Sequence, residues 1–385
     1  MWRHIAANAF TFLIVGLFLM AGVVAWGTRQ YSAAGPLDAA ICLEVPSGGT
    51  MRRLSADLVE RDAISSAFIF ETGADYTDKS GLLKQGRFRV PEQASMEEII
   101  DIVTRGGRNT CGAEVIYRVG INRTIVDVRE LDPATNEFID LASFQAGEAE
   151  VPEAYTEVRA DGEATYRIVI AEGATSWQIL NALGQMDILQ SDITDVPAEG
   201  SLAPQDYIVR EGDTISSVLT RMRDTQAAIM TTAWENRVEG LPLLSAEEAM
   251  VLASIIEKET SVPEERRQVA SVFVNRLNRG MRLQTDPTVI YGITRGEGVL
   301  GRGLRQSELR GATPWNTYVI EGLPPTPIAN PGKAAIEAAL NPDTTEYIFF
   351  VADGTGGHAF ATNLDDHNRN VARWREIEAE RASDG

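Results

Sequence analysis

The stretch Ser245-Ala-Glu-Glu-Ala-Met-Val-Leu-Ala-Ser-Ile-Ile-Glu-Lys-Glu-Thr260 decides the organisation of this 385-residue chain. Ser245 followed by Glu248 is a capping box, which predicts a helix that begins at about Ala246. The residues 249–256 are almost continuously apolar, so we expect this helix to be buried rather than amphipathic.

Glu257 ends the apolar run and shares a helical face with Met250 and Ala253. A carboxyl group in line with core positions must be paired, neutralised or placed at the edge of a cleft, because burial disfavours its charged form. A glutamic acid kept protonated in this way can donate a proton near neutral pH. The alternative is a solvated carboxylate in the last helical turn. In that alternative Lys258 and Glu259 are its exposed neighbours. On either interpretation we expect Glu259 to be solvated and to point away from Glu257.

The composition restricts the class of partner. The chain has 44% hydrophobic and 23% charged residues, as ordinary globular proteins do, and a formal net charge of −20. This charge argues against nucleic acid, which needs a basic surface, and against tight docking on anionic lipid. A polysaccharide substrate would tolerate it, since sugars are bound through hydrogen bonds and stacking.

An uncharged run of 22 residues, Ile5 to Trp26, is long enough to cross a bilayer as a helix. Arg3 precedes the run, and Trp2 and Trp26 stand where interfacial aromatic residues are favoured. The alternative is a cleaved signal peptide, whose apolar core is shorter. The sequence favours residues 1–30 as a cytoplasmic stub and single transmembrane anchor in the cell inner (cytoplasmic) membrane, with the catalytic part in the periplasm.

Two cysteines, Cys42 and Cys111, are too far apart in the sequence for a CxxC metal or redox motif. An exported disulfide is the prediction for that compartment, and two unpaired buried thiols are the alternative.

One pattern recurs four times after the predicted anchor: a short strand, a polar turn, a Ser or Thr placed as a helix cap, and a helix. The four copies are Leu43–Thr50, Phe88–Ser95, Ile168–Thr175 and Tyr207–Thr214. They predict two repeat pairs, at residues 37–112 and 166–235. The stretch from Tyr207 to Ile215 resembles the opening of LysM modules, which bind glycans that contain N-acetylglucosamine; a scaffold of the same geometry without a sugar site is the alternative.

Residues 113–165 separate the two pairs and are expected to be an insertion or hinge. Val115–Val119 and Arg123–Val128 have the pattern of strands, and Gln145–Tyr155 is acidic and linker-like.

The last third of the chain has three further helix signals. Ser261 and Glu264 form a second predicted capping box, Asp286 is predicted to cap a helix that starts at Pro287, and Asn330-Pro331 starts another that ends near Leu340. Tyr347–Ala352 and His358–Thr362 predict a hairpin. The Gly- and Arg-rich stretch 293–311 is either a solvated loop or a local attraction for acidic substrate groups.

Five motifs in order carry a resemblance to the MltG (YceG-like) endolytic murein transglycosylases. They are Leu252-Ala-Ser-Ile-Ile-Glu-Lys-Glu-Thr260, Gln284-Thr-Asp-Pro-Thr-Val-Ile-Tyr-Gly292, Asn316-Thr-Tyr318, Gly322-Leu-Pro-Pro325 and Val351-Ala-Asp-Gly-Thr-Gly-Gly-His-Ala-Phe360. The likeness is close over residues 241–374 and only architectural before them. The resulting fold class is α+β: an anchor helix, LysM-like strand-turn-helix units, and a mixed α/β catalytic domain at 241–380 with a C-terminal hairpin and helix.

The resemblance implies cleavage of the MurNAc–GlcNAc bond inside peptidoglycan strands, with Glu257 as the sole acid and base and with no cofactor or metal ion. It implies Gln284, Asp286, Asn316, Tyr318 and His358 around the sugar, although His358 by itself could equally be structural. It also implies peptidoglycan glycan strands and cell-wall synthases (penicillin-binding proteins) as partners, and the termination of nascent strands as the role.

Two rival functions stay open. A muramidase would hydrolyse the same bond with a second carboxylate, Asp286 or Glu259. A membrane-tethered glycan-binding scaffold would explain the repeats but not a glutamate at the end of a buried helix.

Overall fold

The fold is described from a computed structural model that covers residues 2–46, 48–105, 111–162 and 164–383, with side chains described only between residues 14 and 381. The chain is a mixture of helices and small sheets, so the predicted α+β class is confirmed. It divides into two compact units. Unit 1 comprises Met1–Val115, Val128–Ala142 and Pro152–Thr165, and unit 2 comprises Ile116–Asp127, Ser143–Val151 and Tyr166–Gly385.

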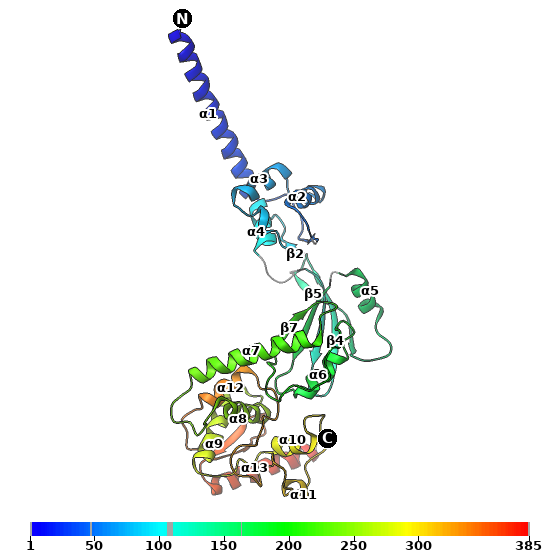
Figure 1. Cartoon of the computed structure of the whole chain (residues 1–385), viewed down its shortest axis with the longest axis vertical. Helices are drawn as coiled ribbons and strands as arrows, with labels where there is room; N and C mark the ends of the chain where they lie inside the picture. The colour runs from blue at the N-terminus through cyan, green and yellow to red at the C-terminus, as the bar shows by residue number, and fades with distance from the viewer. Residues whose placement is uncertain (1, 47, 106–110, 163, 384–385) are drawn as a thin grey trace. The chain divides into compact units, whose positions relative to one another are not determined.

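The chain starts with the long helix α1 (Trp2–Ser32), labelled in Figure 1. Among the residues that the structure describes, no helix combines the length and the apolar character needed to cross a bilayer. Residues 5–13 of the predicted span, Ile5 to Trp26, lie outside those with described side chains.

All four strand-turn-cap-helix copies are confirmed. The strands are β1 (Ile41–Val45), β2 (Gly86–Val90), β6 (Thr165–Ile170) and β7 (Asp206–Val209). The helices that follow them are α2 (Met51–Glu60), α4 (Met96–Thr104), α6 (Ser176–Gly184) and α7 (Ile215–Glu235). The predicted hydroxyl residue of each copy accepts a backbone N–H at the start of its helix. The copies join in pairs, because β1 pairs with β2 and β6 with β7, both antiparallel.

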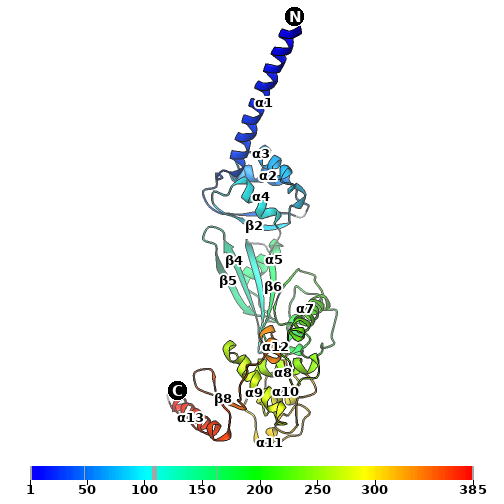
Figure 2. The ribbon, with the colours of Figure 1, turned by 90° about the vertical axis from the view of Figure 1, so that its left-hand side faces the viewer.

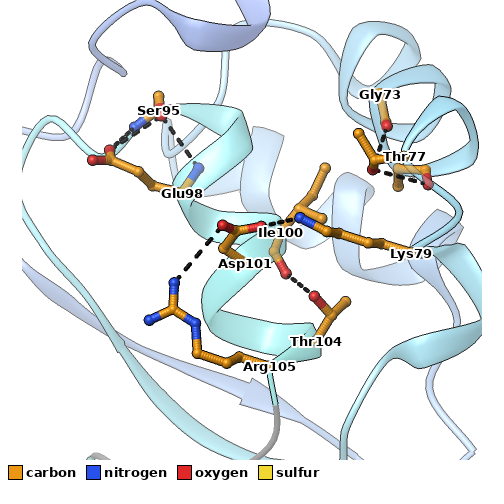
Figure 3. Close-up of polar contacts among 10 residues, drawn as sticks. Gly73, Thr77, Lys79, Ser95, Glu98, Ile100, Asp101, Thr104 and Arg105 are labelled. Carbon is orange, nitrogen blue, oxygen red and sulfur yellow. Dashed lines mark hydrogen bonds and ion pairs between the residues drawn. The ribbon is translucent and has the colours of Figure 1, made fainter.

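Unit 1 packs the first pair around a core that includes Leu43, Leu58 and Phe70. Figure 3 shows the capping box of α4, in which the Ser95 hydroxyl accepts the Glu98 N–H and the Glu98 carboxylate accepts the Ser95 N–H. The unit also holds α3 (Ala67–Tyr76), the short 3₁₀ helix η1 (Ser80–Leu82) and α5 (Glu153–Asp161).

The predicted disulfide between Cys42 and Cys111 is present, with the two Cα atoms 5.7 Å apart. It fastens β1 to the segment that follows α4, within unit 1.

The stretch between the repeat pairs is mostly strand. Strands β3 (Gly112–Val119) and β4 (Thr124–Asp132) match the two predicted strands, whereas β5 (Glu137–Gln145) was not predicted. The three strands share one five-stranded sheet with the second repeat pair, in the order β5-β4-β3-β6-β7. The division of the chain into domains at residues 113 and 165 stays a prediction.

The helices of unit 2 pack around the buried α8 (Ala246–Glu259), which contacts α7, α9 (Arg266–Asn278), α10 (Asp286–Thr294) and α12 (Lys333–Leu340). Figure 1 shows α8, α9 and α12 gathered below α7. The apolar run of α8 forms the middle of this core, as the sequence predicts. The short helix α11 (Gln306–Leu309) lies in the Arg-rich stretch.

Three predicted helix starts in unit 2 are wrong. The second capping box does not form: a 3₁₀ turn, η2 (Pro263–Glu265), occupies its place without a side-chain cap, and α9 starts after it. Helix α12 starts at Lys333, because Asn330 is buried and bonded elsewhere and Gly332 is the N-cap. Asp286 is the first residue of α10 rather than its cap, and its carboxylate accepts a tyrosine hydroxyl instead.

The predicted C-terminal hairpin is confirmed as β8 (Phe349–Ala352) and β9 (His358–Ala361), in antiparallel register. The last helix, α13 (Leu364–Ser383), packs beside β8, as Figure 2 shows.

Candidate active site

The helix that carries Glu257 starts at Ala246, as its sequence predicts, but only half of the predicted capping box forms. The Ser245 hydroxyl caps α8 by accepting the Glu248 N–H at 3.4 Å, and the Glu248 carboxylate turns back to the Leu244 N–H at 2.7 Å. Every residue from Val251 to Ile256 is buried, and Glu257 is the first residue after this run that is only half-buried. The side chain therefore stands at the edge of the core.

The backbone of a distant loop contacts the Glu257 carboxyl. Its Oε2 accepts the Gly332 N–H at 2.9 Å, just before α12. Burial raises the pKa of Glu257, and the nearby Glu172 carboxylate raises it further, whereas the Gly332 N–H and the charge of Arg266 oppose the shift. A carboxyl group of this kind stays protonated to higher pH than a solvated one.

The turn of the third repeat copy lies against the same helix end. Gly173 has a φ of +77°, and a Cβ atom there would lie 3.6 Å from Glu257 Cγ. The Gly173 carbonyl accepts the Lys258 ammonium at 3.3 Å. Glu172 Oε2 faces Arg266 at 3.6 Å, and a Cβ atom on Gly332 would collide with the Glu172 carboxylate. The repeat therefore contributes a second carboxylate beside Glu257 that the sequence did not single out.

Lys258 is not the exposed neighbour that the alternative of a solvated Glu257 predicts. Burial lowers the pKa of its ammonium, although the charges of Glu257 and Glu199 counteract the shift. Its place between the third repeat and α8 explains the burial, because the Gly173 turn covers it.

Glu259 is also not the solvated neighbour that was predicted. Its carboxylate accepts the hydroxyl of Thr285, and burial raises its pKa. Asp286, His358 and Arg276 lie close enough to shift that pKa as well, Asp286 upward and the other two downward. The prediction fails because α10 packs against this end of α8, which the local sequence does not encode.

The residues predicted around the sugar gather on the Glu259 side of the helix end. The Tyr318 hydroxyl donates to Asp286 Oδ1 at 2.7 Å, and burial raises the pKa of Tyr318. Gln284 is exposed, with a φ of +50°. Among the described residues, none of the five predicted sugar-contacting side chains hydrogen-bonds to Glu257; the five are Gln284, Asp286, Asn316, Tyr318 and His358.

Asn316 cannot line a sugar cleft in this structure, because its side chain is fully buried. Its amide nitrogen donates to the carbonyls of Glu308, Leu309 and Gly311, and its oxygen accepts the Tyr318 N–H. The residue holds the α11 turn against the segment that carries Tyr318, so the prediction of direct sugar contact is corrected to a structural role.

His358 has a fixed orientation at the start of β9. Its Nδ1 lies 2.8 Å from Glu265 Oε2, and its backbone N–H donates to Glu265 Oε1 at 2.9 Å. Phe350 packs edge-on against the ring, with the centroids 5.2 Å apart. The glutamate partner could not be found from sequence spacing, because 93 residues separate the pair.

A buried polar cluster that the sequence did not indicate joins the repeats to this region. The fully buried Asn330 donates to the Ala174 carbonyl, the Ser176 hydroxyl and Glu199 Oε1, and it accepts the Leu202 N–H. Burial raises the pKa of Glu199. The Glu199 oxygens also accept the Ser176 N–H at 2.8 Å and the Tyr291 hydroxyl at 3.3 Å.

A metal centre has no evident ligands here: in the part of the chain that the structure describes, His, Cys, Asp and Glu do not form a group of three suited to an ion. At the helix end, the half-buried carboxyl of Glu257 with its raised pKa defines a candidate acid–base site.

The comparisons with known proteins identify the family of the chain. The model of the YceG-like family matches residues 142–373, and the chain belongs to that family. It is 28% identical over 334 residues to a protein named endolytic murein transglycosylase from Bacillus subtilis (strain 168), covering 86% of this chain and 84% of the relative. A protein of the same name from Streptococcus pneumoniae (strain ATCC BAA-255 / R6) is 26% identical over 382 residues.

The pneumococcal match covers 96% of this chain and 65% of the relative, so the chain spans just under two thirds of that protein. A crystal structure of a yceG-like protein from Listeria monocytogenes covers 86% of this chain and 98% of its own, at 23% identity and a TM-score of 0.45.

Proposed function

We propose that this chain is an endolytic lytic transglycosylase that cleaves the β-1,4 bond between MurNAc and GlcNAc inside peptidoglycan strands and leaves 1,6-anhydroMurNAc ends. Membership of the YceG-like family and the names of the two relatives support the reaction. The observation that carries the site is the half-buried Glu257 carboxyl, whose pKa burial raises and whose Oε2 is held by the Gly332 N–H.

The reaction needs a single residue that first gives and then takes a proton. With Oε2 fixed by Gly332, Oε1 of the protonated Glu257 donates to the glycosidic oxygen, and the bond from that oxygen to C1 of MurNAc breaks. The resulting carboxylate takes the proton of the MurNAc C6 hydroxyl, whose oxygen closes on C1. Glu257 ends protonated, as it began, and no water is consumed.

The surroundings of Glu257 suit both halves of this cycle. Burial and the Glu172 charge favour the acid, whereas the Gly332 N–H, Arg266 and Lys258 stabilise the carboxylate that forms after proton donation. Proton transfer of this kind contributes about 10²–10⁴-fold, so most of the remaining rate must come from holding the sugar in a reactive geometry. We assign that holding to Gln284, Asp286, Tyr318 and His358.

A second candidate function is hydrolysis, and one contact favours it. Hydrolases of this kind use two carboxyl groups, and Glu172 is a carboxylate that lies close enough to raise the pKa of Glu257. If Glu172 activated a water molecule, the chain would be a muramidase.

The direct test of the site is Glu257→Gln. Glutamine keeps the size of the side chain and can still accept the Gly332 N–H, but it cannot donate and recover a proton. We expect a loss of cleavage of at least about 100-fold on purified peptidoglycan, followed by chromatography of the released glycans. Glu376→Gln, at an exposed position on α13, is the matched control and should cleave normally. Retention of most activity by Glu257→Gln would place the acid elsewhere.

We further propose that residues 1–30 anchor the chain once in the cytoplasmic membrane, that the rest lies in the periplasm, and that the enzyme acts on nascent strands beside cell-wall synthases. The support is the uncharged 22-residue run and the disulfide of unit 1, which suits an oxidising compartment. A reporter that is active only in the periplasm, fused after Gly385, should be active. An inactive reporter, or a mature chain that starts near Gly27, would contradict the topology.

A further inference from the structure

A pocket of about 290 Å³ lies in unit 2, on the third repeat copy rather than on the fourth copy that resembles LysM. The β3–β4 turn, helix α6 and residues 298–299 line it. We call it the amide pocket, because most of its polar lining consists of carboxamides around one indole ring: Asn122, Gln145, Trp177, Gln178, Asn181 and Gln185.

Helix α6 arranges three of these side chains in a row. Trp177 and Asn181 are four residues apart on one face of α6, and Gln185, the C-cap residue of the helix, follows after another four. The row extends for about 12 Å, given the rise per residue of a helix. Its Trp177 end is four residues along the chain from Gly173, where a Cβ atom would lie 3.6 Å from Glu257 Cγ. The row and the turn beside the candidate catalytic carboxyl therefore belong to the same repeat copy.

The amides of the pocket are free to bind a ligand. Gln178 is the exception, since it donates to the Ile121 carbonyl at 2.9 Å and accepts the Thr175 N–H. No hydrogen bond to a described residue engages the side-chain amides of the other four, Asn122, Gln145, Asn181 and Gln185. Each carries both donors and an acceptor, which match the hydroxyl and acetamido groups of a sugar.

The charge of the pocket is unusual for this chain. Among its described lining residues there is no Asp or Glu, although the chain carries 55 acidic residues. Arg123 is the single charged residue in the lining. Uncharged hydrogen-bonding groups beside an aromatic ring, which can cover the apolar face of a pyranose, select a neutral ligand.

We propose that the amide pocket binds an N-acetylhexosamine unit of the glycan strand, remote from the bond that is cleaved. The proposal rests on the function proposed above and extends it. An enzyme that cuts inside a strand must hold sugars beyond the scissile bond, and the pocket belongs to the same repeat copy as the Gly173 turn beside Glu257. The pocket thus selects long strands over short fragments.

The test compares binding of long and short strands by the full-length chain carrying Glu257→Gln, so that no substrate is cleaved. The probes are peptide-free glycan strands, one long fraction and one tetrasaccharide, titrated by calorimetry. Asn181→Ala should weaken binding of the long strands by about 5-fold, and Trp177→Ala by about 10-fold. Binding of the tetrasaccharide, which offers fewer sugars beyond the scissile bond, should change by less.

Asn368→Ala, an exposed amide on α13, is the matched control and should leave both affinities unchanged. Asn181 is exposed, so its replacement keeps the test valid if Trp177→Ala fails to fold. Equal affinities of the Asn181→Ala and parent chains for long strands would overturn the proposal.

The test is separate from that of the proposed function. A strand-length preference that depends on Asn181, together with cleavage that survives Glu257→Gln, would support sugar binding in the amide pocket and contradict the assignment of Glu257 as the catalytic residue. If Glu257→Gln abolishes cleavage but Asn181→Ala does not change strand binding, only the proposal of sugar binding in the amide pocket is contradicted.

Discussion

Neighbouring charges shift the pKa of Glu257 in opposite directions. The charge of Glu172 is one that a conservative substitution can remove. The Glu172 charge raises the pKa of Glu257, whereas Arg266 lowers it. An acid catalyst works only while protonated, so its activity declines as the pH rises through its pKa. A raised pKa therefore extends cleavage to higher pH.

Glu172→Gln removes one negative charge near the site and leaves Arg266 without this partner. The pKa of Glu257 should fall, and the alkaline limb of the pH–rate profile should move to lower pH. The measurement is kcat/KM for glycan cleavage across pH, with Glu376→Gln as a control for the loss of a distant carboxylate. A limb that stays in place would mean that Glu172 does not act on Glu257, and a complete loss of activity at every pH would favour the muramidase.

The burial of Glu259 could not be predicted from the residues next to it in the sequence. Its neighbours along the chain are Lys258 and Thr260, which predict a polar helix end facing solvent. Its partner is instead Thr285, 26 residues further on. No spacing rule connects the two, because the contact exists only once α10 packs against α8.

At the scale of elements, the local signals were predictable. Thr50, Ser95, Thr175 and Thr214 all cap helices, because a cap and its N–H partner lie within three residues of each other. The burial of α8 followed from its apolar run, and the hairpin followed from two strand-like runs separated by a turn. The second capping box failed since Pro263 starts a 3₁₀ turn where the helix was expected.

Contacts between elements were not predictable. The sequence placed Glu257 correctly at a helix end but gave no sign that Gly332 and the Gly173 turn would meet it. Asn330 was expected to start a helix, and it instead bonds to the third repeat copy 154 residues earlier at Ser176. The sequence thus pointed to Glu257 as the candidate acid but did not indicate the groups that surround its carboxyl.

The buried amide of Asn330 is predicted to hold the third repeat copy against the helices of unit 2. Asn330→Asp keeps the shape but removes the donors to Ala174 and Ser176 and adds a charge beside Glu199. We expect the free energy of unfolding to fall by roughly 2–4 kcal/mol in urea titrations. The exposed Asn368→Asp serves as the control, and an equally small change for both variants would contradict the assigned role.

At the scale of the whole molecule, the disulfide is the covalent constraint of unit 1. Cys42 and Cys111 are 69 residues apart in the sequence, and closing a loop of that length stabilises a fold by about 4 kcal/mol in the chain-entropy model. Replacing both by serine should speed amide hydrogen exchange in α2 and α4 of unit 1. The amides of α8, in unit 2, provide the internal control. Unchanged exchange in unit 1 would show that the loop is held by its packing alone.

The central claim is that this chain cleaves peptidoglycan by an internal transfer without water. Digestion of purified peptidoglycan by the full-length chain in ¹⁸O-labelled water, followed by mass spectrometry of the glycan ends, tests it most directly. We predict 1,6-anhydro ends without label. Reducing ends that carry ¹⁸O would contradict the claim, make the chain a hydrolase, and direct the search for its second carboxylate to Glu172 and then Asp286.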